Sequence, residues 1–206
     1  MQKMVARRKL LLNLRDAQGG STMKLLGIPA SNSIQSINGQ LVRLALDWTT
    51  DMLDASADKA VLDLNAYEMP IYSIDRETAD GVPLEAQAFL DEIAAADALL
   101  ISFAEHNGSY TAAFKNIFDW ASRLNGKVYQ DKPVVMMATS PGKRGGAAVL
   151  SAATTAAPFF GATLVGSYSL GSFGEAFDSD NGIITDEQKE NELRAVLREL
   201  VSHLSQ

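Results

Sequence analysis

The stretch from residue 98 to residue 121 constrains the fold most strongly, because it holds a complete strand, loop and helix. Residues 98–103 are small or apolar, which is typical of a strand buried on both faces. A polar turn follows at residues 105–109, and Gly108 permits a sharp bend there. From about Thr111, apolar residues recur at helical spacing, namely Phe114, Ile117, Phe118 and Ala121. The unit is either an ordinary connection or a ligand-binding edge, since open α/β sheets bind ligands where their strands end.

The same alternation extends along the chain. Apolar runs predict five strands, at residues 24–29, 60–64, 98–103, 133–139 and 162–170. Helical spacing predicts five helices, at residues 41–52, 84–96, 111–121, from 147 onward and at 185–204. This pattern indicates an α/β fold, a three-layer sandwich around a five-stranded parallel sheet. Polar loops follow the first, third and fourth strands, and these loops meet if the sheet has the flavodoxin-like order 2-1-3-4-5.

Finer predictions concern the connections and helix faces. Residues 65–83 are expected to form an irregular surface loop that covers a pocket or a subunit interface. Residues 171–182 are expected to form a second loop, rich in Gly and Asp. Residues 185–188 have the capping-box form and should start the last helix, with His203 in its final turn. The helix at residues 84–96 should bury Leu84, Ala88, Ile93 and Ala96.

The loop after the first strand is rich in hydroxyl groups. Ser31, Ser33, Ser36 and Asn38 lie within eight residues, directly before a helix. Free N–H groups and the helix dipole favour an anion at such a place. The alternative is ordinary helix capping, for which Ser and Asn are favoured. Neither a Walker A sequence nor Gly-x-Gly-x-x-Gly occurs here, so a P-loop NTPase or a dinucleotide-type Rossmann site does not fit.

The loop after the fourth strand, residues 140–146, combines three glycines with two cations. Glycine lets a backbone lie flat against a ligand. Lys143 and Arg144 can neutralise a phosphate, or they can simply be solvated surface charges. The sequence leaves these alternatives open.

Composition excludes several classes of protein. The chain has 206 residues, enough for one domain with a substantial core. It has no cysteine, which excludes disulfides, thiolate metal sites and thiol nucleophiles, and its two histidines, far apart in sequence, argue against a multi-histidine metal site. The formal charge of −7 argues against nucleic-acid binding.

Residues 1–22 are set apart by charge and form a basic N-terminal extension. They carry five basic residues and one acidic residue, which leaves 13 basic and 24 acidic residues, a charge of −11, for residues 23–206. The apolar run at residues 10–12 is too short for a signal peptide or a membrane span. The extension is interpreted as disordered or non-native, with a basic transit peptide as the alternative. Residues 23–206 are predicted to be one domain, without a membrane span and cytoplasmic.

Three motifs in order resemble those of the NADPH-dependent FMN reductases, a flavodoxin-like family that includes quinone, azo-dye and chromate reductases. The family's Gly-Ser-x-Arg-x-x-Ser-x-Asn corresponds to residues 30–38. Its Pro-Glu-Tyr-Asn-Gly-Ser, followed by Lys-Asn-x-x-Asp-Trp, corresponds to residues 104–109 and 115–120. Its Ser-x-Gly-x-x-Gly-Gly corresponds to residues 140–146. The resemblance extends from Met23 to the C-terminus.

The resemblance implies non-covalent FMN, reduced by NADPH or NADH as co-substrate, which passes electrons to a small-molecule acceptor such as a quinone, an azo compound, a metal oxyanion or free flavin. The residues that it implies around the phosphate are Ser31, Ser33, Ser36 and Asn38. Those along the isoalloxazine edge are Glu105, His106, Asn107 and Gly108. Those that close over the ring are Ser140, Gly142, Lys143, Arg144 and Gly145, and the two cations are also candidates for the nicotinamide cofactor's phosphates. No catalytic side chain is expected, because the cofactor carries the chemistry.

The chain departs from the family pattern at three positions. Ser33 replaces an Arg, which removes a charge-assisted contact worth about 1.5–3 kcal/mol. Ala104 replaces a Pro, and His106 replaces a Tyr; the imidazole is either a pH-dependent donor beside the flavin or a space filler. These departures favour an alternative function, an FMN-binding electron carrier or flavin-sensing module. A third possibility is a domain that has lost its flavin.

The helix motif at residues 115–120 has two interpretations. Its side chains serve either in chemistry or in packing and oligomer contacts, and the packing role is favoured. The residues concerned are Lys115, Asn116, Asp119 and Trp120. The resemblance implies a homodimer or a homotetramer that assembles through this region.

Overall fold

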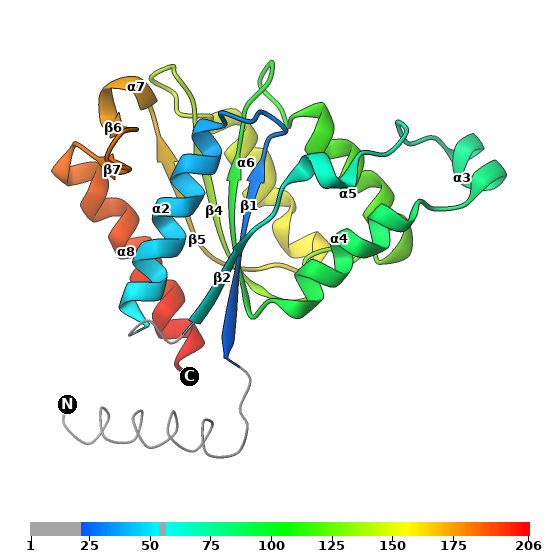
Figure 1. Ribbon diagram of the computed structural model, residues 1–206, viewed down its shortest axis with the longest axis horizontal. Coiled ribbons are helices and arrows are strands. Elements are labelled where there is room, and N and C mark those ends of the chain that lie inside the picture. Colours follow the sequence, from blue (N-terminus) through cyan, green and yellow to red (C-terminus); the bar gives the residue numbers. More distant parts are fainter. Residues whose placement is uncertain (1–21, 54–56) are drawn as a thin grey trace.

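The computed structural model describes residues 22–53 and 57–206, and a sheet of five parallel strands lies at its centre (Figure 1). The strands are β1 (Met23–Ala30), β2 (Ala57–Val61), β3 (Ala98–Phe103), β4 (Pro133–Thr139) and β5 (Thr163–Leu170). Their order across the sheet is β2-β1-β3-β4-β5, which confirms the flavodoxin-like arrangement predicted from the sequence. The interpretation of residues 1–22 falls outside the described residues, except for Thr22.

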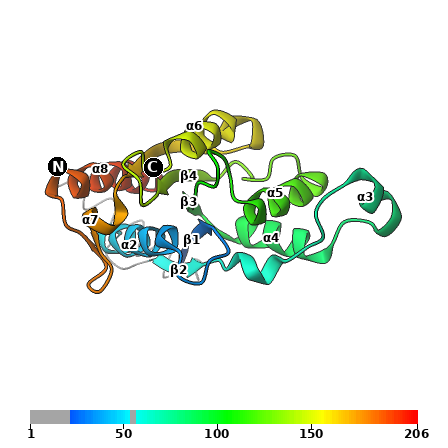
Figure 2. The same cartoon turned by 90° about the horizontal axis from the view of Figure 1, so that it is seen from above.

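Helices cover both faces of the sheet, as the view from above shows (Figure 2). One face is covered by α2 (Ile37–Met52) and α8 (Glu187–Leu204). The other is covered by α4 (Leu84–Ala95), α5 (Ala112–Leu124) and α6 (Ala147–Ala156). The molecule is therefore the predicted three-layer sandwich.

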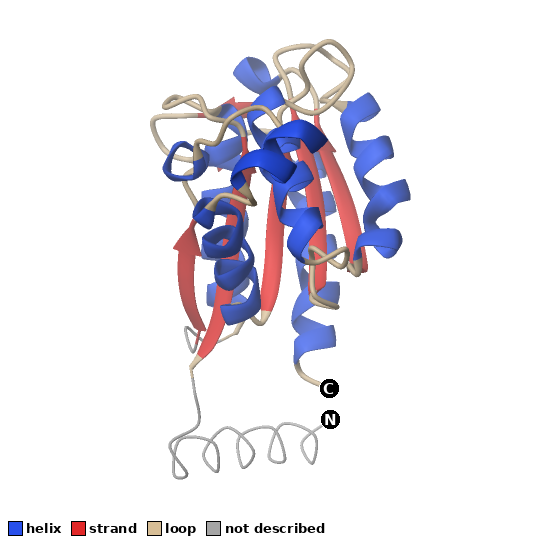
Figure 3. Ribbon diagram, turned by 90° about the vertical axis from the view of Figure 1, so that its right-hand side faces the viewer, coloured by secondary structure: helices blue, strands red, loops and turns tan. Residues whose placement is uncertain are grey.

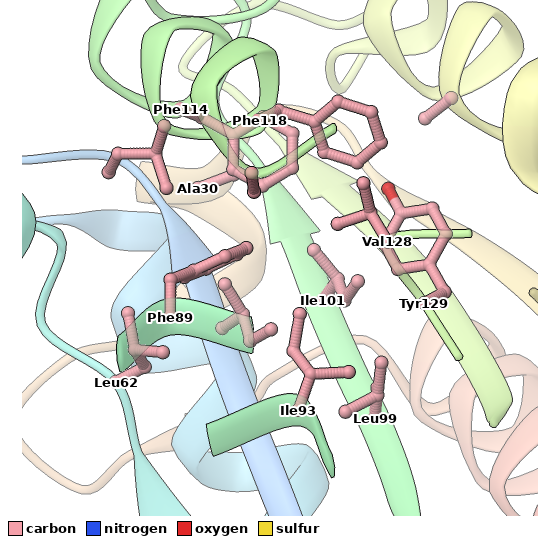
Figure 4. Close-up of a cluster of buried hydrophobic side chains, with 14 of the residues drawn as sticks. Ala30, Leu62, Phe89, Ile93, Leu99, Ile101, Phe114, Phe118, Val128 and Tyr129 are labelled. Carbon is pink, nitrogen blue, oxygen red and sulfur yellow. The ribbon is translucent and has the colours of Figure 1, made fainter. Parts of the chain in front are cut away.

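The middle strands are almost entirely apolar because each lies between two cores. Successive side chains of a strand point to opposite faces, so Ile101 joins the core under α4 and α5 while Leu100 joins the core under α2 and α8. Figure 4 shows the first core, in which Phe89 of α4 and Phe114 and Phe118 of α5 lie over the sheet. The apolar character of β3, in which Ser102 is the one polar residue, is thus a direct consequence of its central place.

The carboxyl ends of all five strands lie at one edge of the sheet, and Figure 3 shows loops gathered at that end. The strands β1, β3 and β4 are neighbours there. The three polar loops noted in the sequence therefore start side by side.

The second strand was predicted three residues too late, at residues 60–64 instead of Ala57–Val61. β2 is an edge strand, and its Asp58, Lys59 and Ala60 are exposed. The apolar Leu62 and Leu64 enter the core only after the strand has ended, where the 3-10 helix η1 (Leu64–Tyr67) begins. Apolar character here marks the return of the chain to the core and not the strand itself.

The prediction of an irregular segment at residues 65–83 was wrong in part. It contains η1 and a two-turn helix, α3 (Ile74–Asp80), which projects from the body beyond α4 and α5 (Figures 1 and 2). The Ser73 hydroxyl accepts the Arg76 N–H and caps this helix, and Gly81, with φ +78°, ends it.

The buried face of α4 was predicted only in part: Ile93 and Ala96 are buried as expected, but Leu84 and Ala88 are not. Ala86, Phe89, Leu90 and Ile93 are buried, whereas Leu84 is 85% exposed and Ala88 is exposed. Phe89 and Leu90 together bury more apolar area than Leu84 and Ala88 would, so α4 directs Phe89 and Leu90 toward the core.

The C-terminal connections hold two further differences. Asp186, not Thr185, caps α8 by accepting the Lys189 N–H, and the Thr185 hydroxyl donates to the Glu175 carbonyl instead. The expected loop at residues 171–182 contains a short helix, α7 (Phe173–Ala176), and one strand of a small hairpin, β6 (Phe177–Asp178) with β7 (Ile183–Ile184).

Within the described part of the chain, no helix has both the length and the apolar character to cross a membrane.

Candidate functional site

The first loop, residues 31–36, leads directly into the N-terminus of α2. Ser36 is the N-cap, and its hydroxyl accepts the Gly39 N–H at 3.2 Å. Ser31 accepts the Ser33 N–H at 3.2 Å, which curls the loop, and Ser33 is exposed. One serine therefore serves the capping predicted as the alternative, while two others remain at the surface beside the positive end of the helix.

Asn38 lies beneath this loop and not in it. It is 2% exposed, and its side-chain oxygen accepts the Ser102 hydroxyl at 2.7 Å and the Thr139 N–H at 3.1 Å. Its amide nitrogen donates to the Thr139 carbonyl at 3.2 Å. The prediction that places this side chain at a phosphate therefore needs revision, because the side chain is directed into the sheet.

The second loop folds into a tight turn at its tip. His106 and Ser109 exchange two backbone hydrogen bonds of 3.0 and 3.1 Å, and Asn107 and Gly108 both have positive φ, of 52° and 76°. That is the geometry of a type I′ turn, for which Asn-Gly is the favoured pair. His106, Asn107 and Gly108 are exposed on this turn.

Glu105 was predicted at the edge of a ring ligand, but its carboxylate contacts the protein. One carboxylate oxygen accepts the N–H groups of Ala148 and Val149, at 2.9 and 3.0 Å, in the first turn of α6. A carboxylate is favoured there by the unpaired N–H groups and by the helix dipole. No local sequence signal predicts a contact over 43 residues, and Glu105 thereby ties the second loop to the helix that follows the third.

The third loop, residues 140–146, is held from behind by the segment after β5. The N–H groups of Ser172 and Phe173 donate to the carbonyls of Gly142 and Ser140, at 3.0 and 3.1 Å. A Cβ on Gly145, whose φ is +56°, would lie 2.5 Å from the Ser169 hydroxyl and 2.7 Å from the Gly171 nitrogen. Gly145 is thus required by packing within the protein, whereas Gly142 is exposed.

Lys143 and Arg144 are exposed at the tip of the third loop. The structure brings them to the same edge of the sheet as the first and second loops, because β4 is separated from β1 only by β3. All three predicted loops therefore meet, although Asn38, Glu105 and Gly145 support the site from within.

The helix motif of α5 anchors the projecting segment that contains α3. Asn116 accepts the Tyr72 N–H at 2.9 Å and donates to the carbonyls of Met69 and Pro70, and the Trp120 ring N–H donates to Pro70 at 2.7 Å. Lys115 and Asp119 pair with each other at 2.6 Å on the same helix. These contacts give the motif a structural role, as the sequence analysis favoured.

Two tyrosines of the core beneath α5 have raised pKa values. Burial raises the pKa of Tyr110, which packs between Phe103 and Phe114, so its hydroxyl stays protonated at neutral pH. Burial also raises the pKa of Tyr129 deeper in the same core. Among residues 22–53 and 57–206, no group of three or more His, Asp or Glu side chains is placed to hold a metal ion.

The fold and the three loops define a flavodoxin-like α/β protein, with its ligand edge at the ends of β1, β3 and β4. The sequence pattern of the family described as NADPH-dependent FMN reductase matches residues 23–175, so the chain belongs to that family. The family resemblance found in the three motifs is thereby confirmed.

Individual relatives agree with this assignment. Quinone reductase of Escherichia coli (strain K12) is 30% identical over 112 residues, or 54% of this chain and 57% of that protein, so the match spans little more than half of its length. NAD(P)H:quinone oxidoreductase of Solanum tuberosum is 30% identical over 179 residues, or 85% of this chain and 89% of that protein. A similar solved structure is that of FerB, a flavoenzyme NAD(P)H:(acceptor) oxidoreductase from Paracoccus denitrificans. Its TM-score is 0.66 at 24% sequence identity, and the match covers 88% of this chain and 97% of that one. This similarity shows a shared fold.

Proposed function

We propose that the protein is an oxidoreductase that transfers electrons from NADPH or NADH, through non-covalently bound FMN, to a quinone or another small acceptor. The observation that carries the proposal is the meeting of three loops of complementary chemistry at one edge of the sheet: serine hydroxyls at a helix N-terminus, a rigid Asn-Gly turn and a Gly-bearing loop with two cations. Family membership supports it. FMN, when bound, supplies the hydride acceptance and electron transfer.

The donor set of the first loop fits the phosphate of FMN. Ser31, Ser33 and Ser36 offer hydroxyls beside the positive end of α2, and no acidic side chain lies in residues 30–38. Gln40, one turn into α2, has a buried side-chain oxygen without a donor in the described structure, and a hydroxyl of the ribityl chain is a suitable one. Asn38 is reassigned from phosphate contact to support.

The other two loops are assigned to the ring. The exposed backbone of His106, Asn107 and Gly108 would line the ring edge, and Ser140 and Gly142 would cover its face. The positive side chains of Lys143 and Arg144 are suited to the phosphates of the nicotinamide cofactor, because they are exposed beside this surface in an otherwise acidic body.

A visible absorption spectrum after dialysis against FMN, repeated after anaerobic addition of NADPH, tests the proposal. A retained flavin band that bleaches with NADPH is the expected result. A band that persists with NADPH and with NADH would instead support an electron carrier or flavin sensor, which the exposed Ser33 in place of Arg favours. No retained band would refute flavin binding.

We further propose a homo-oligomer that uses the projecting segment around α3. Ile71 and Ile74 are 75% and 59% exposed on this segment, and Leu84, directly after it, is 85% exposed. These exposed apolar side chains lie within 14 residues of the sequence, and contiguous exposed apolar surface is typical of an interaction site. Ile71→Glu should lower the mass measured by light scattering, whereas Ile183→Glu, an exposed isoleucine of β7, should not.

A further inference from the structure

Three buried polar side chains connect the ends of strands β3 and β4 with the start of α2. Asn38, Ser102 and Thr139 are 2%, 0% and 1% exposed, in a region where the sheet is otherwise apolar. A buried polar group is stable only when its hydrogen bonds are made, and here each of the three side chains bonds another of them or the backbone of β4 or β5. The position of each group is therefore tightly specified.

Asn38 takes the place of a missing strand residue. The pairing of β3 with β4 ends at Phe103 and Ala138, so Thr139 has no partner on β3. The side-chain amide of Asn38 bonds both the N–H and the carbonyl of Thr139, as a neighbouring strand would. Only an amide does this, because the two partners require one acceptor and one donor side by side.

The network continues on both sides of this pair. The Ser102 hydroxyl of β3 donates to the Asn38 oxygen at 2.7 Å, and the Thr139 hydroxyl donates to the Leu170 carbonyl of β5 at 2.7 Å. Asn38 follows the first loop by two residues, and Thr139 directly precedes the third loop. One chain of hydrogen bonds thus joins the bases of the two loops across β3.

We propose that Asn38 and Ser102 are positioning residues, which fix the spacing between the loop at residues 31–36 and the loop at residues 140–146. The inference rests on the proposed function, in which the first loop holds the phosphate of FMN and the third covers the ring. A ligand that engages both loops depends on their spacing, although neither Asn38 nor Ser102 touches it. Riboflavin, which lacks the phosphate, depends on it much less.

Fluorescence titration of FMN and of riboflavin against Asn38→Ala, Ser102→Ala and the double variant tests this role. Asn38→Ala should weaken FMN binding at least tenfold and Ser102→Ala at least threefold, with riboflavin changed less than twofold. The double variant should be no weaker than Asn38→Ala, because both changes break one network. Asn191→Ala, an exposed asparagine of α8 outside the three loops, is the matched control and should bind FMN as the wild type does.

Other results would overturn the inference. Loss of FMN affinity in Asn38→Ala but not in Ser102→Ala would indicate direct phosphate contact by Asn38. Lower melting temperatures with unchanged FMN affinity would indicate a purely structural network. If Asn38→Ala does not fold, Ser102→Ala alone decides, since it removes one hydroxyl and leaves the Thr139 pair in place. If the wild-type protein binds no FMN, the proposed function itself is refuted. If the wild type binds FMN and both variants bind it equally well, only the positioning role is refuted.

Discussion

Replacing Ser33 with Arg should strengthen FMN binding. Ser33 is exposed on the first loop, where the family pattern has an Arg, and its neighbour Ile34 is 98% exposed, so a long side chain can be accommodated without disturbing the core. A guanidinium donates two parallel hydrogen bonds to a phosphate. Such a contact contributes about 1.5–3 kcal/mol, which corresponds to about 10- to 150-fold in affinity.

The exposure of Ser33 places the expected gain at the lower end, about tenfold, because solvent screens the pair. The assay is quenching of flavin fluorescence with FMN and with riboflavin, at low and at high salt. Riboflavin lacks the phosphate and should bind Ser33→Arg and the wild type equally. Ile34→Arg adds the same charge one residue away and is the control for a general electrostatic effect.

Two results would refute this reasoning. Unchanged FMN affinity in Ser33→Arg would mean that the phosphate does not lie at residues 31–36. An equal gain for FMN and riboflavin, or an equal gain in Ile34→Arg, would mean that the added charge acts without recognising the phosphate.

Three further predictions concern stability. Glu105→Gln should lower the free energy of unfolding by about 1 kcal/mol in urea, because it removes the charge at the α6 N-terminus; an unchanged value would contradict that role. Asn116→Ala should speed amide exchange in residues 69–80 while β3 stays protected, since it removes three hydrogen bonds to that segment, although Trp120 still donates to the Pro70 carbonyl. Hydrogen bonds from Asn181 lower the pKa of Asp178. That stabilisation is complete above the ordinary Asp pKa and is lost as pH falls through the lowered one, so Asp178→Asn should lose less stability on acidification than the wild type.

The sequence was sufficient to locate the central strands because β3 and β4 are buried on both faces, whereas the strand order was predicted from the flavodoxin-like pattern and confirmed by the structure. Central strands of this kind are almost entirely apolar, with one buried polar residue each in Ser102 and Thr139, so their apolar runs locate them at Ala98–Phe103 and Pro133–Thr139. The edge strand β2 lacks this signal, since Asp58 and Lys59 face solvent. Its predicted position was therefore taken from Leu62 and Leu64, which are buried beyond the strand.

The three polar loops were also located correctly as loops, because each follows a strand whose end was evident. What the sequence could not show is which side chains of a loop face a ligand. The Asn38 contact to Thr139 spans 101 residues, and the Glu105 contact to Ala148 spans 43. Neither has a periodic or local signature, so both residues were grouped with their exposed neighbours.

The retained and the changed positions of the family motifs differ in their surroundings. Asn38, Glu105 and Trp120, which match the family pattern, use their side chains to join one segment of the protein to another. Two of the three departures, Ser33 and His106, are exposed at the ligand edge. Changes at these two positions alter the surface offered to a flavin or its acceptor without breaking a contact that holds the loops together. The framework of the site and its ligand preference are therefore separable in this chain, and Ser33→Arg should change the second without loss of the first.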